Sequence, residues 1–501
     1  MTIRNMMRRL GVLAAAAAMA LGLATPALAD MASKTATVTI GGLETGEGVA
    51  SGTATAYKII DVNWDDANGQ PKTPNYTWNN AVKDTVAGIP DTDYVGADGS
   101  VADSFTGADA AKKVADAIAG AGVGTAIEGT VANGTATFSN LEMGGYLVVI
   151  ANSTNRVYQP IVVNVVPQYK DGAWVLDDAS LTNITAKYSE TGITKKITGV
   201  DNETTNVAED GKTAGAGIGD TVSYQLESPV PAYPDNAKST VFKISDALTN
   251  LDLVADSIKV VGVPARGAEV ELKDGFTKTA TANGFTLDFT YANIKQYQKI
   301  KVTYNAKVNA SAKVTEANPN TATLTYSNAP YTENNFTTKT DDAKVYTYGL
   351  NVLKVDADNH ETKLSGAEFE LYQGKTKIDV KKGDDGVYRP DANGADVLTT
   401  SDPEGAFKLD GLAPGSYSLK ETKAPGGYSL PSGTIDFTIA DDDLDGKVNE
   451  GTTGYVSQTV QNSKGFQLPT TGGAGTVALT AAGVLVMAGA AFALIRARRS
   501  E

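Results

Sequence analysis

Apolar and polar residues alternate along many stretches of the chain, and this pattern predicts β-strands. Val38 and Ile40 would face one side of such a strand. Thr37 and Thr39 would face the other side. Alternation with a period of two, in runs rich in Thr, Val, Ile and Tyr, is typical of half-buried strands. Similar runs occupy residues 57–62, 144–149 and 161–166, so we expect an all-β protein.

One stretch departs from this pattern and predicts a helix. Apolar residues recur there at helical spacing, namely Ala111, Val114, Ala115 and Ile118. Thr106 or Asp109 would cap the start of the helix, and Gly120 would end it. The N-terminal part of the chain is therefore predicted to be mostly β with one helical insertion.

Three polar residues fall at inward positions of strands in the middle of the chain. Lys195 shares a strand face with Ile193 and Ile197, because residues two apart point the same way. Asp246 and Asn320 alternate with apolar residues in two later strands. Burying any of these side chains without a partner would cost free energy. We therefore expect the three side chains to meet.

The C-terminal part repeats this arrangement with Lys354, Glu421 and Asn462. Burial lowers the pKa of a lysine and raises the pKa of a carboxyl group. A neutral lysine is a nucleophile, and a protonated acid can donate a hydrogen bond to the Asn carbonyl oxygen. The chemistry that follows is an amide cross-link between strands with loss of ammonia. The alternative is a buried salt bridge or hydrogen-bonded cluster that does not react.

Both ends of the chain carry apolar segments. Arg4, Arg8 and Arg9 precede the apolar residues 10–23, and the small-x-small sequence that ends at Ala29 predicts a signal peptide over 1–29. Near the other end, the apolar residues 477–495 are long enough for a transmembrane helix. Arginines follow this segment, as is typical of the cytoplasmic side.

A pentapeptide precedes the C-terminal apolar segment and consists of Leu468, Pro469, Thr470, Thr471 and Gly472. The pentapeptide, the apolar span and the basic tail together resemble the cell-wall sorting signal of Gram-positive surface proteins. The resemblance implies that a sortase cuts between Thr471 and Gly472 and passes the acyl group to an amine. The alternative is a plain C-terminal membrane anchor.

Composition narrows the classes of function. The chain of 501 residues has a formal net charge of −15, so nucleic acid is not expected as a partner. It has no cysteine and a single histidine, His360, which argues against disulfides, histidine-based catalysis and His-rich metal sites. Its length suggests three domains between the terminal segments. We place them at residues 30–188, 189–346 and 347–465, followed by the sorting signal at 466–501.

The run at 417–428 reads YSLKETKAPGGY. It closely resembles the E-box, YxLxETxAPxGY, of collagen-adhesin B-type domains and sortase-assembled pilins. The resemblance implies immunoglobulin-like β-sandwiches in which a first-strand Lys is bonded to a last-strand Asn with help from the E-box Glu. It assigns these roles to Lys354, Asn462 and Glu421. By the related pattern, the middle domain has Lys195, Asn320 and Asp246, with Lys196 as a second candidate nucleophile.

An internal repeat extends the comparison to the first domain. Residues 141–150 align with 412–421, so that Tyr146 falls on Tyr417 and Ile150 on Glu421. The first domain would then share the sandwich but lack the acid, and we expect no cross-link there.

Lys187 is a candidate for linkage between subunits. The sequence from Trp174 to Lys187 is similar in part to the pilin motif of shaft pilins, although Ala186 stands at the Pro position and the spacing is longer. The resemblance implies that Lys187 accepts the acyl group from Thr471 of another subunit. The alternative is an ordinary exposed lysine.

Asp441, Asp443 and Asp445, followed by Gly446, fit the opening of a calcium-binding loop. Thr452 stands where a bidentate acid is required, and no flanking helices are predicted. A solvated acidic hairpin is the favoured interpretation, and we expect no metal and no cofactor.

Together these features resemble the major shaft pilin of sortase-assembled, cell-wall-anchored pili, a structural protein and not an enzyme. The resemblance implies pilus-specific and housekeeping sortases, identical subunits and peptidoglycan as partners. A single-copy wall-anchored adhesin for host matrix or glycans would use the same motifs without Lys187. A wall-attached hydrolase would need convergent acids or a nucleophile beside a base, and we find no such group in the sequence.

Overall fold

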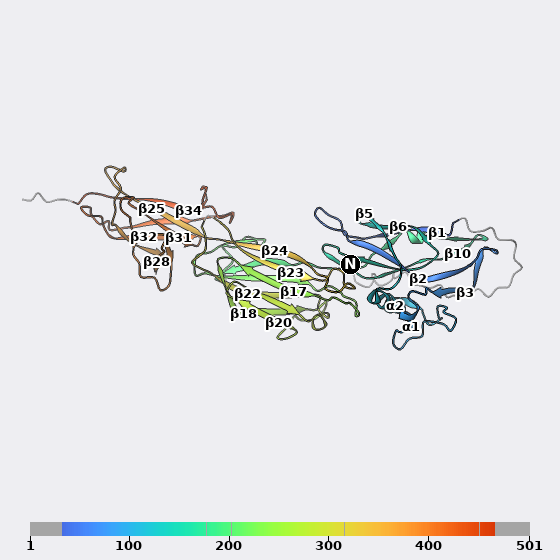
Figure 1. The fold of residues 1–501 in the computed structure, drawn as a ribbon. Helices are drawn as coiled ribbons and strands as arrows, with labels where there is room; N and C mark the ends of the chain where they lie inside the picture. The colour runs from blue at the N-terminus through green and yellow to red at the C-terminus, as the bar shows by residue number, and fades with distance from the viewer. Residues whose placement is uncertain (1–32, 177, 202, 315, 450, 466–501) are drawn as a thin grey trace, which may run out of the picture. The chain divides into compact units, whose positions relative to one another are not determined.

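The computed structural model describes residues 33–465, apart from 177, 202, 315 and 450. Strands hold 51% of the residues and helices 6%, which confirms the predicted all-β fold. The chain forms two compact units, and the second consists of the chain from Tyr346 onward together with the short segments Gly215–Asp220 and Val308–Ala317. Figure 1 traces the strands of both units from the N-terminus in blue to the C-terminus in red. The boundaries of three domains stay a prediction.

The N-terminal part of the first unit is built on two larger sheets and two small ones. One sheet has the order β12 (Ile184–Thr185), β1 (Thr35–Gly41), β6 (Thr135–Glu142) and β5 (Thr130–Ala132). The other has the order β3 (Gln70–Trp78), β2 (Thr53–Asp65), β7 (Gly144–Ala151) and β9 (Ile161–Val165), with β4 (Ala126–Glu128) also paired to β2. The small sheets pair β10 (Pro167–Lys170) with β11 (Ala173–Leu176) and β13 (Tyr188–Glu190) with β8 (Arg156–Tyr158).

Strand β7 is apolar without a break because both of its faces are covered. Val148 and Ile150 pack in one core with Val38 of β1. Leu147 packs in a second core with α2 (Gly107–Ala121). The short helices α1 (Lys83–Ala87) and α3 (Asp178–Leu181) were not predicted from the sequence.

The predicted insertion helix is confirmed, but its predicted end was wrong. Helix α2 buries Val114, Ala115 and Ile118, as the spacing implied. It continues past Gly120 and ends at Ala121, where Gly122 adopts a left-handed conformation with φ of 66°. A glycine in that conformation lets the last turn close without a Cβ clash, which is why the helix ends there.

The remaining part of the first unit is a sandwich of two sheets. One sheet has the order β14 (Thr194–Val200), β16 (Thr221–Pro229), β22 (Lys299–Val308), β18 (Leu251–Val263) and β19 (Val270–Glu271). The other has the order β15 (Thr213–Gly215), β24 (Thr337–Tyr346), β23 (Asn318–Tyr326), β17 (Phe242–Leu248), β21 (Gly284–Phe289) and β20 (Phe276–Thr281). The short 3₁₀ helix η2 (Tyr291–Asn293) follows β21 in sequence.

The second unit also contains two sheets that share one core. The first has the order β28 (Val380–Lys382), β29 (Tyr388–Pro390), β31 (Ala406–Leu412), β25 (Tyr348–Asp356) and β34 (Tyr455–Asn462). The second has the order β27 (Thr376–Ile378), β26 (Glu368–Gln373), β32 (Gly415–Lys423) and β33 (Thr434–Ile439), with β30 (Leu398–Thr399) paired to β26.

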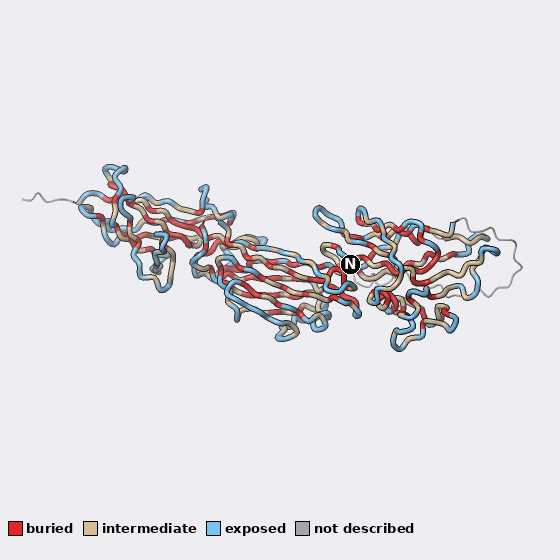
Figure 2. Tube along the Cα trace, in the orientation of Figure 1, coloured by how far each residue is buried: buried red, intermediate tan, exposed pale blue. Residues whose placement is uncertain are grey.

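Burial follows the alternation in the sequence, as the alternating red and pale segments of the strands in Figure 2 show. The predicted inward residues of the middle strands, from Phe242 to Leu248 and from Asn320 to Tyr326, are buried at every second position. The same holds for Leu350, Val352 and Lys354 in β25. No helix in the described ranges is long and apolar enough to cross a membrane. The apolar segments predicted at both ends of the chain fall outside those ranges.

Candidate functional site

The middle sandwich brings Lys195, Asp246 and Asn320 together across its two sheets. Lys195 lies on β14 of one sheet, whereas Asp246 on β17 and Asn320 on β23 belong to neighbouring strands of the other. Asp246 pairs with Ala322, two residues along β23 from Asn320, so both polar side chains point into the core side by side. The side chains of Lys195 and Asp246 are 0% exposed. The sequence prediction that these three residues meet is confirmed.

Hydrogen bonds connect the cluster through a fourth residue, Tyr304 of β22. The Lys195 ammonium donates to Asp246 Oδ2 and, at 2.5 Å, to the Tyr304 hydroxyl oxygen. That hydroxyl donates to Asp246 Oδ1 at 2.7 Å and accepts from Asn320 Nδ2 at 2.9 Å. The carbonyl oxygen of Asn320 is buried without a hydrogen-bond partner. It is the atom on which negative charge would develop if the amine attacked the amide carbon.

Burial shifts both ionisable partners toward their neutral forms. Desolvation lowers the pKa of Lys195 to about 8, although the nearby Asp246 carboxylate opposes the change. Desolvation raises the pKa of Asp246, again against the opposing effect of Lys195. Both shifts favour transfer of a proton from the lysine to the acid, and the neutral lysine would be a nucleophile.

Lys196, the second candidate nucleophile, is exposed on β14. Among the residues that the structure describes, Lys195 and Lys354 are the only buried lysines. Each of them lies in one of the two predicted clusters. A lysine is almost never fully buried unless it is paired, and each of these lysines is paired with a buried carboxyl group.

The C-terminal sandwich forms the second predicted cluster. Lys354 on β25 and Asn462 on β34 lie on neighbouring parallel strands of one sheet, where Lys354 pairs with Val460 and Asp356 with Asn462. Glu421, on β32 of the facing sheet, reaches across the core. The side chains of Lys354 and Glu421 are 0% exposed, and Asn462 is 2% exposed. This cluster is also confirmed as a spatial group.

The contacts of this second cluster are direct. The Lys354 ammonium donates to Asn462 Oδ1 and lies 3.0 Å from Glu421 Oε2. Asn462 Nδ2 donates to Glu421 Oε1 at 2.6 Å. Desolvation lowers the pKa of Lys354, and Phe369 provides an apolar wall 5.9 Å from the ammonium. The nucleophile, the amide and the acid are thus all in contact.

The two clusters differ in which strands they would join. In the C-terminal sandwich Lys354 lies on the first strand and Asn462 on the last, as the resemblance implied. In the middle sandwich Asn320 lies on β23, and β24 follows it. A first-to-last-strand link was therefore wrong for the middle sandwich. Its cause is the extra strand β24, which pairs along the full length of β23.

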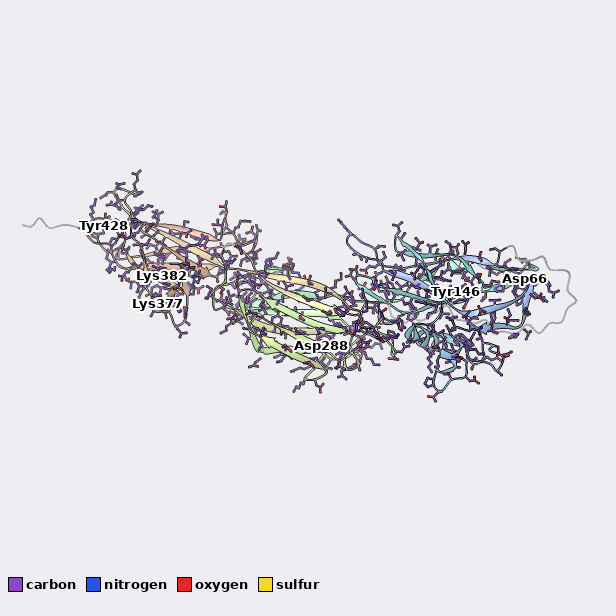
Figure 3. All side chains as sticks on the ribbon, in the orientation of Figure 1. Asp66, Tyr146, Asp288, Lys377, Lys382 and Tyr428 are labelled. Atoms are coloured by element: carbon purple, nitrogen blue, oxygen red, sulfur yellow. The ribbon has the colours of Figure 1, made fainter. Side chains whose placement is uncertain are left out.

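The internal repeat of the sequence is also a structural repeat. The Tyr146 hydroxyl, labelled in Figure 3, donates to the carbonyl of Glu142 at 2.8 Å. The Tyr417 hydroxyl donates to the carbonyl of Ala413 at 2.9 Å, also four residues back. Ile150 is buried where the C-terminal sandwich has Glu421. The absence of a cross-link from the first domain stays a prediction.

Sequence reasoning missed a polar group around Asp356, which pairs with Asn462 at the end of β34. Asp356 is 1% exposed and accepts hydrogen bonds from the Tyr428 hydroxyl at 2.7 Å and from the backbone of Asp358 at 2.7 Å. The Lys464 ammonium lies 3.2 Å from the same carboxylate. These hydrogen bonds, the one from Tyr428 foremost, hold the pKa of Asp356 well below its usual range. Tyr428, labelled in Figure 3, is the last residue of the E-box.

Lys187 is exposed between β12 and β13. Its neighbour Ala186 is buried in the core and bonded to Gly41, and the carbonyl of Lys187 accepts from Gln159 at 2.9 Å. The backbone is therefore held on both sides while the ammonium faces solvent. Its role as an acyl acceptor stays a prediction.

Asp441, from the candidate calcium loop, is occupied by hydrogen bonds within the protein. Its Oδ2 accepts from the Tyr348 hydroxyl at 2.7 Å and from the backbone of Gly446 at 2.8 Å. Asp443 and Asp445 are exposed. Within the described ranges no three metal-ligating side chains come together, and His360 is exposed. The sortase pentapeptide, Leu468 to Gly472, lies outside those ranges.

Two family models match the C-terminal part of the chain. Residues 349–452 match a prealbumin-like fold domain, and residues 460–501 match the LPXTG cell wall anchor motif. The anchor match includes the predicted pentapeptide and the apolar span. It supports a location at the cell wall.

Several relatives are similar over longer stretches. The trypsin-resistant surface T6 protein of Streptococcus pyogenes is 28% identical over 339 residues, which cover 61% of this chain and 57% of that protein. Fimbrial subunit type 1 of Actinomyces viscosus is 26% identical over 423 residues, covering 72% and 74%. The chain thus spans a little over half of the first relative and about three quarters of the second.

The solved structures include the T6 backbone pilin of S. pyogenes serotype M6, described as a modular three-domain protein. It superposes with a TM-score of 0.62 at 22% identity and covers 87% of this chain and 99% of that one. This likeness shows a shared fold. Together with the relatives and the anchor motif, it confirms the resemblance of this chain to the shaft pilins of Gram-positive bacteria.

Proposed function

We infer that the chain is the structural backbone subunit of a covalently polymerised pilus anchored to the cell wall. The observation that carries this inference is the pair of buried clusters, each with a lysine, a carboxylic acid and an asparagine in contact. Each cluster would form one Lys–Asn isopeptide bond and release ammonia. The fimbrial relatives and the anchor motif support the wider assignment.

The clusters have the properties that the reaction needs. Each fold holds the amine beside the amide, which converts a slow bimolecular reaction into an intramolecular one. Burial lowers the pKa of both lysines, which favours the neutral amine that the reaction needs. The bonds would stabilise an exported chain that has no cysteine for disulfides.

Polymerisation would use two sites on each subunit, the pentapeptide near the C-terminus and Lys187. A sortase would cleave after Thr471 and join its carbonyl to Lys187 of the next subunit. A head-to-tail contact that repeats without closing produces a fibre. A housekeeping sortase would finally transfer the fibre to peptidoglycan, and the fibre would serve adhesion.

The test is mass spectrometry of the folded, mature chain together with denaturing gels of wall extracts. The intact mass should fall short of the sequence mass by two molecules of ammonia, and tryptic peptides should join Lys195 to Asn320 and Lys354 to Asn462. Wall extracts should give a ladder of bands that resists boiling. A full sequence mass would refute the isopeptide bonds, and a single band would favour a single-copy adhesin.

A further inference from the structure

We propose that the Tyr304 hydroxyl is a catalytic group of the middle cluster that carries a proton to the departing nitrogen of Asn320. This proposal rests on the proposed formation of the Lys195–Asn320 bond. It concerns how that reaction is completed, and it assigns a role to a residue outside the set of lysine, acid and asparagine.

The position of Tyr304 is the main evidence. Its hydroxyl oxygen lies 2.5 Å from Lys195 Nζ, 2.7 Å from Asp246 Oδ1 and 2.9 Å from Asn320 Nδ2. It therefore contacts the nucleophile, the acid and the leaving group at once. Such contacts within hydrogen-bond distance are the first requirement for a group that transfers protons.

Comparison with the C-terminal cluster explains why a fourth residue is present. There, Asn462 Nδ2 donates directly to Glu421 at 2.6 Å. In the middle cluster the acid is Asp246, whose side chain is one methylene shorter, and Asn320 Nδ2 instead donates to Tyr304, which donates to Asp246. The Tyr304 hydroxyl thus links the asparagine to the acid in the middle cluster. In the C-terminal cluster the longer glutamate makes this hydrogen bond directly.

The surroundings of Tyr304 fix its hydroxyl in place. The ring stacks on Tyr224 at a centroid distance of 5.3 Å and contacts the edge of Phe285 at 4.9 Å. The residue is 1% exposed, so water does not compete for its hydroxyl. Burial raises the pKa of Tyr304 well above its ordinary value, and the hydroxyl keeps its proton at neutral pH.

The proton balance of the reaction closes with this arrangement. Lys195 first gives one proton to Asp246 Oδ2, which leaves a neutral amine and a carboxylic acid. The amine then forms the Nζ–Cγ bond with Asn320, and Nζ must lose a second proton. As the Cγ–Nδ2 bond breaks, Tyr304 gives its proton to Nδ2 and takes one from Asp246, while Asp246 takes the second proton of Nζ. Ammonia leaves, Tyr304 is restored, and Asp246 remains protonated.

The substitution Tyr304→Phe tests the proposal because it removes the hydroxyl and keeps the ring. The mature chain would be recovered unfolded and unreacted from inclusion bodies in urea, refolded by dilution, and sampled over time by intact mass. We expect the loss of ammonia from the middle cluster to slow by about 10²-fold or more, as for removal of a general acid. The Lys354–Asn462 bond should form at the wild-type rate, and it reports that the same molecules react normally elsewhere.

Tyr233→Phe is the matched control. The Tyr233 hydroxyl is also buried in this sandwich, where it donates to the carbonyl of Val241 at 3.0 Å and accepts from the backbone of Ser327 at 3.0 Å. This variant loses a comparable buried hydroxyl away from the cluster. It should form both bonds at the wild-type rate.

A second variant keeps the test decisive if Tyr304→Phe does not fold. Replacing Tyr304 with 3-fluorotyrosine keeps the hydroxyl but makes it more acidic, so bond formation should persist with its pH profile shifted to lower pH. An unchanged profile, or wild-type speed in Tyr304→Phe, would overturn the role of Tyr304 alone. A wild-type chain that never forms the Lys195–Asn320 bond would overturn the proposed reaction, and the role of Tyr304 with it.

Discussion

Lys195 places a single charged group in the core of the middle sandwich. Its Nζ is surrounded by the rings of Tyr224 and Tyr304, at 4.8 and 5.2 Å from their centroids, and by one carboxylate. An ammonium group buried in this way would lower the stability of the fold unless it is neutralised or paired. The proposed amide bond would remove this charge permanently. The reaction would thereby remove the electrostatic cost of burying the ammonium.

This cost predicts a pH dependence in a variant that cannot react. In Asn320→Ala, Lys195 stays an amine whose pKa falls from 10.5 to about 8 on folding. Between these values the unfolded chain binds the extra proton, so the free energy of unfolding should rise with pH, by up to about 3 kcal/mol. In the wild type the proposed bond would convert Lys195 to an amide, which does not titrate. Urea unfolding of both proteins between pH 8 and 10 measures the difference, and equal slopes would argue against a buried free amine in the variant.

Glu421 carries the corresponding prediction for the C-terminal sandwich. Glu421→Ala should prevent the bond between Lys354 and Asn462, which are 108 residues apart in sequence. By analogy with a disulfide that closes a loop of about 100 residues, the variant should lose roughly 4–5 kcal/mol of stability. Intact mass and thermal unfolding measure the two effects. Glu361→Ala, a change on the exposed surface of the same sandwich, should alter neither.

The sequence was sufficient to predict which three polar residues meet in each cluster, because each of them interrupts an alternating apolar pattern at an inward position. It did not reveal Tyr304, although that residue also points inward on β22. A tyrosine at an inward position is ordinary core packing in most strands. Only the distances to three polar neighbours give it a different meaning, and those depend on how the two sheets face each other.

At the scale of elements, the end of β34 must be held in register for its asparagine to react. Asp356 pairs with Asn462 across two parallel strands, and the backbone of Ala357 donates to the carbonyl of Asn462 at 3.0 Å. The Asp356 carboxylate also binds Tyr428 and Lys464. The last residue of the E-box, Tyr428, therefore binds the β25 residue that pairs with Asn462.

Removing this contact should slow the C-terminal bond. In Tyr428→Phe the Asp356 carboxylate loses its hydroxyl partner, and we expect slower loss of one ammonia during refolding while the middle bond forms normally. Tyr372→Phe is the control, because Tyr372 and its hydroxyl partner Glu370 both lie on β26 of the same sandwich and do not contact Asp356. Intact mass over time measures both variants. Equal rates in wild type and Tyr428→Phe would show that β34 keeps its register without this contact.

Element boundaries were harder to predict than element types. Helix α2 passes Gly120 because an interior glycine costs only about 1 kcal/mol, and the left-handed Gly122 provides a better end. The strand β24, which follows Asn320, was not predicted because its residues 337–344 are largely polar. Charged residues such as Lys339, Asp341 and Asp342 gave no alternating apolar signal there.

At the scale of the whole molecule, the proposed function needs an acyl donor and an acyl acceptor on each subunit. The substitution Lys187→Ala should remove the acyl acceptor and leave the donor at Thr471 intact. We expect the ladder in wall extracts to collapse to a monomer that remains attached to the wall. Lys196→Ala is the control, since Lys196 is also exposed and lies nearby in sequence. An unchanged ladder in Lys187→Ala would mean that another lysine accepts the acyl group.

The strand that follows Asn320 has a mechanical consequence. Under tension along a fibre, the C-terminal sandwich would carry load from β25 through the Lys354–Asn462 bond, and the residues between them would be shielded from force. In the middle sandwich the load would leave the bond at Asn320 and then run through residues 321–346, which include β24. That segment has a contour length of up to about 90 Å when fully extended. The middle sandwich would thus extend under force as β24 separates from β23, whereas the C-terminal sandwich would not extend.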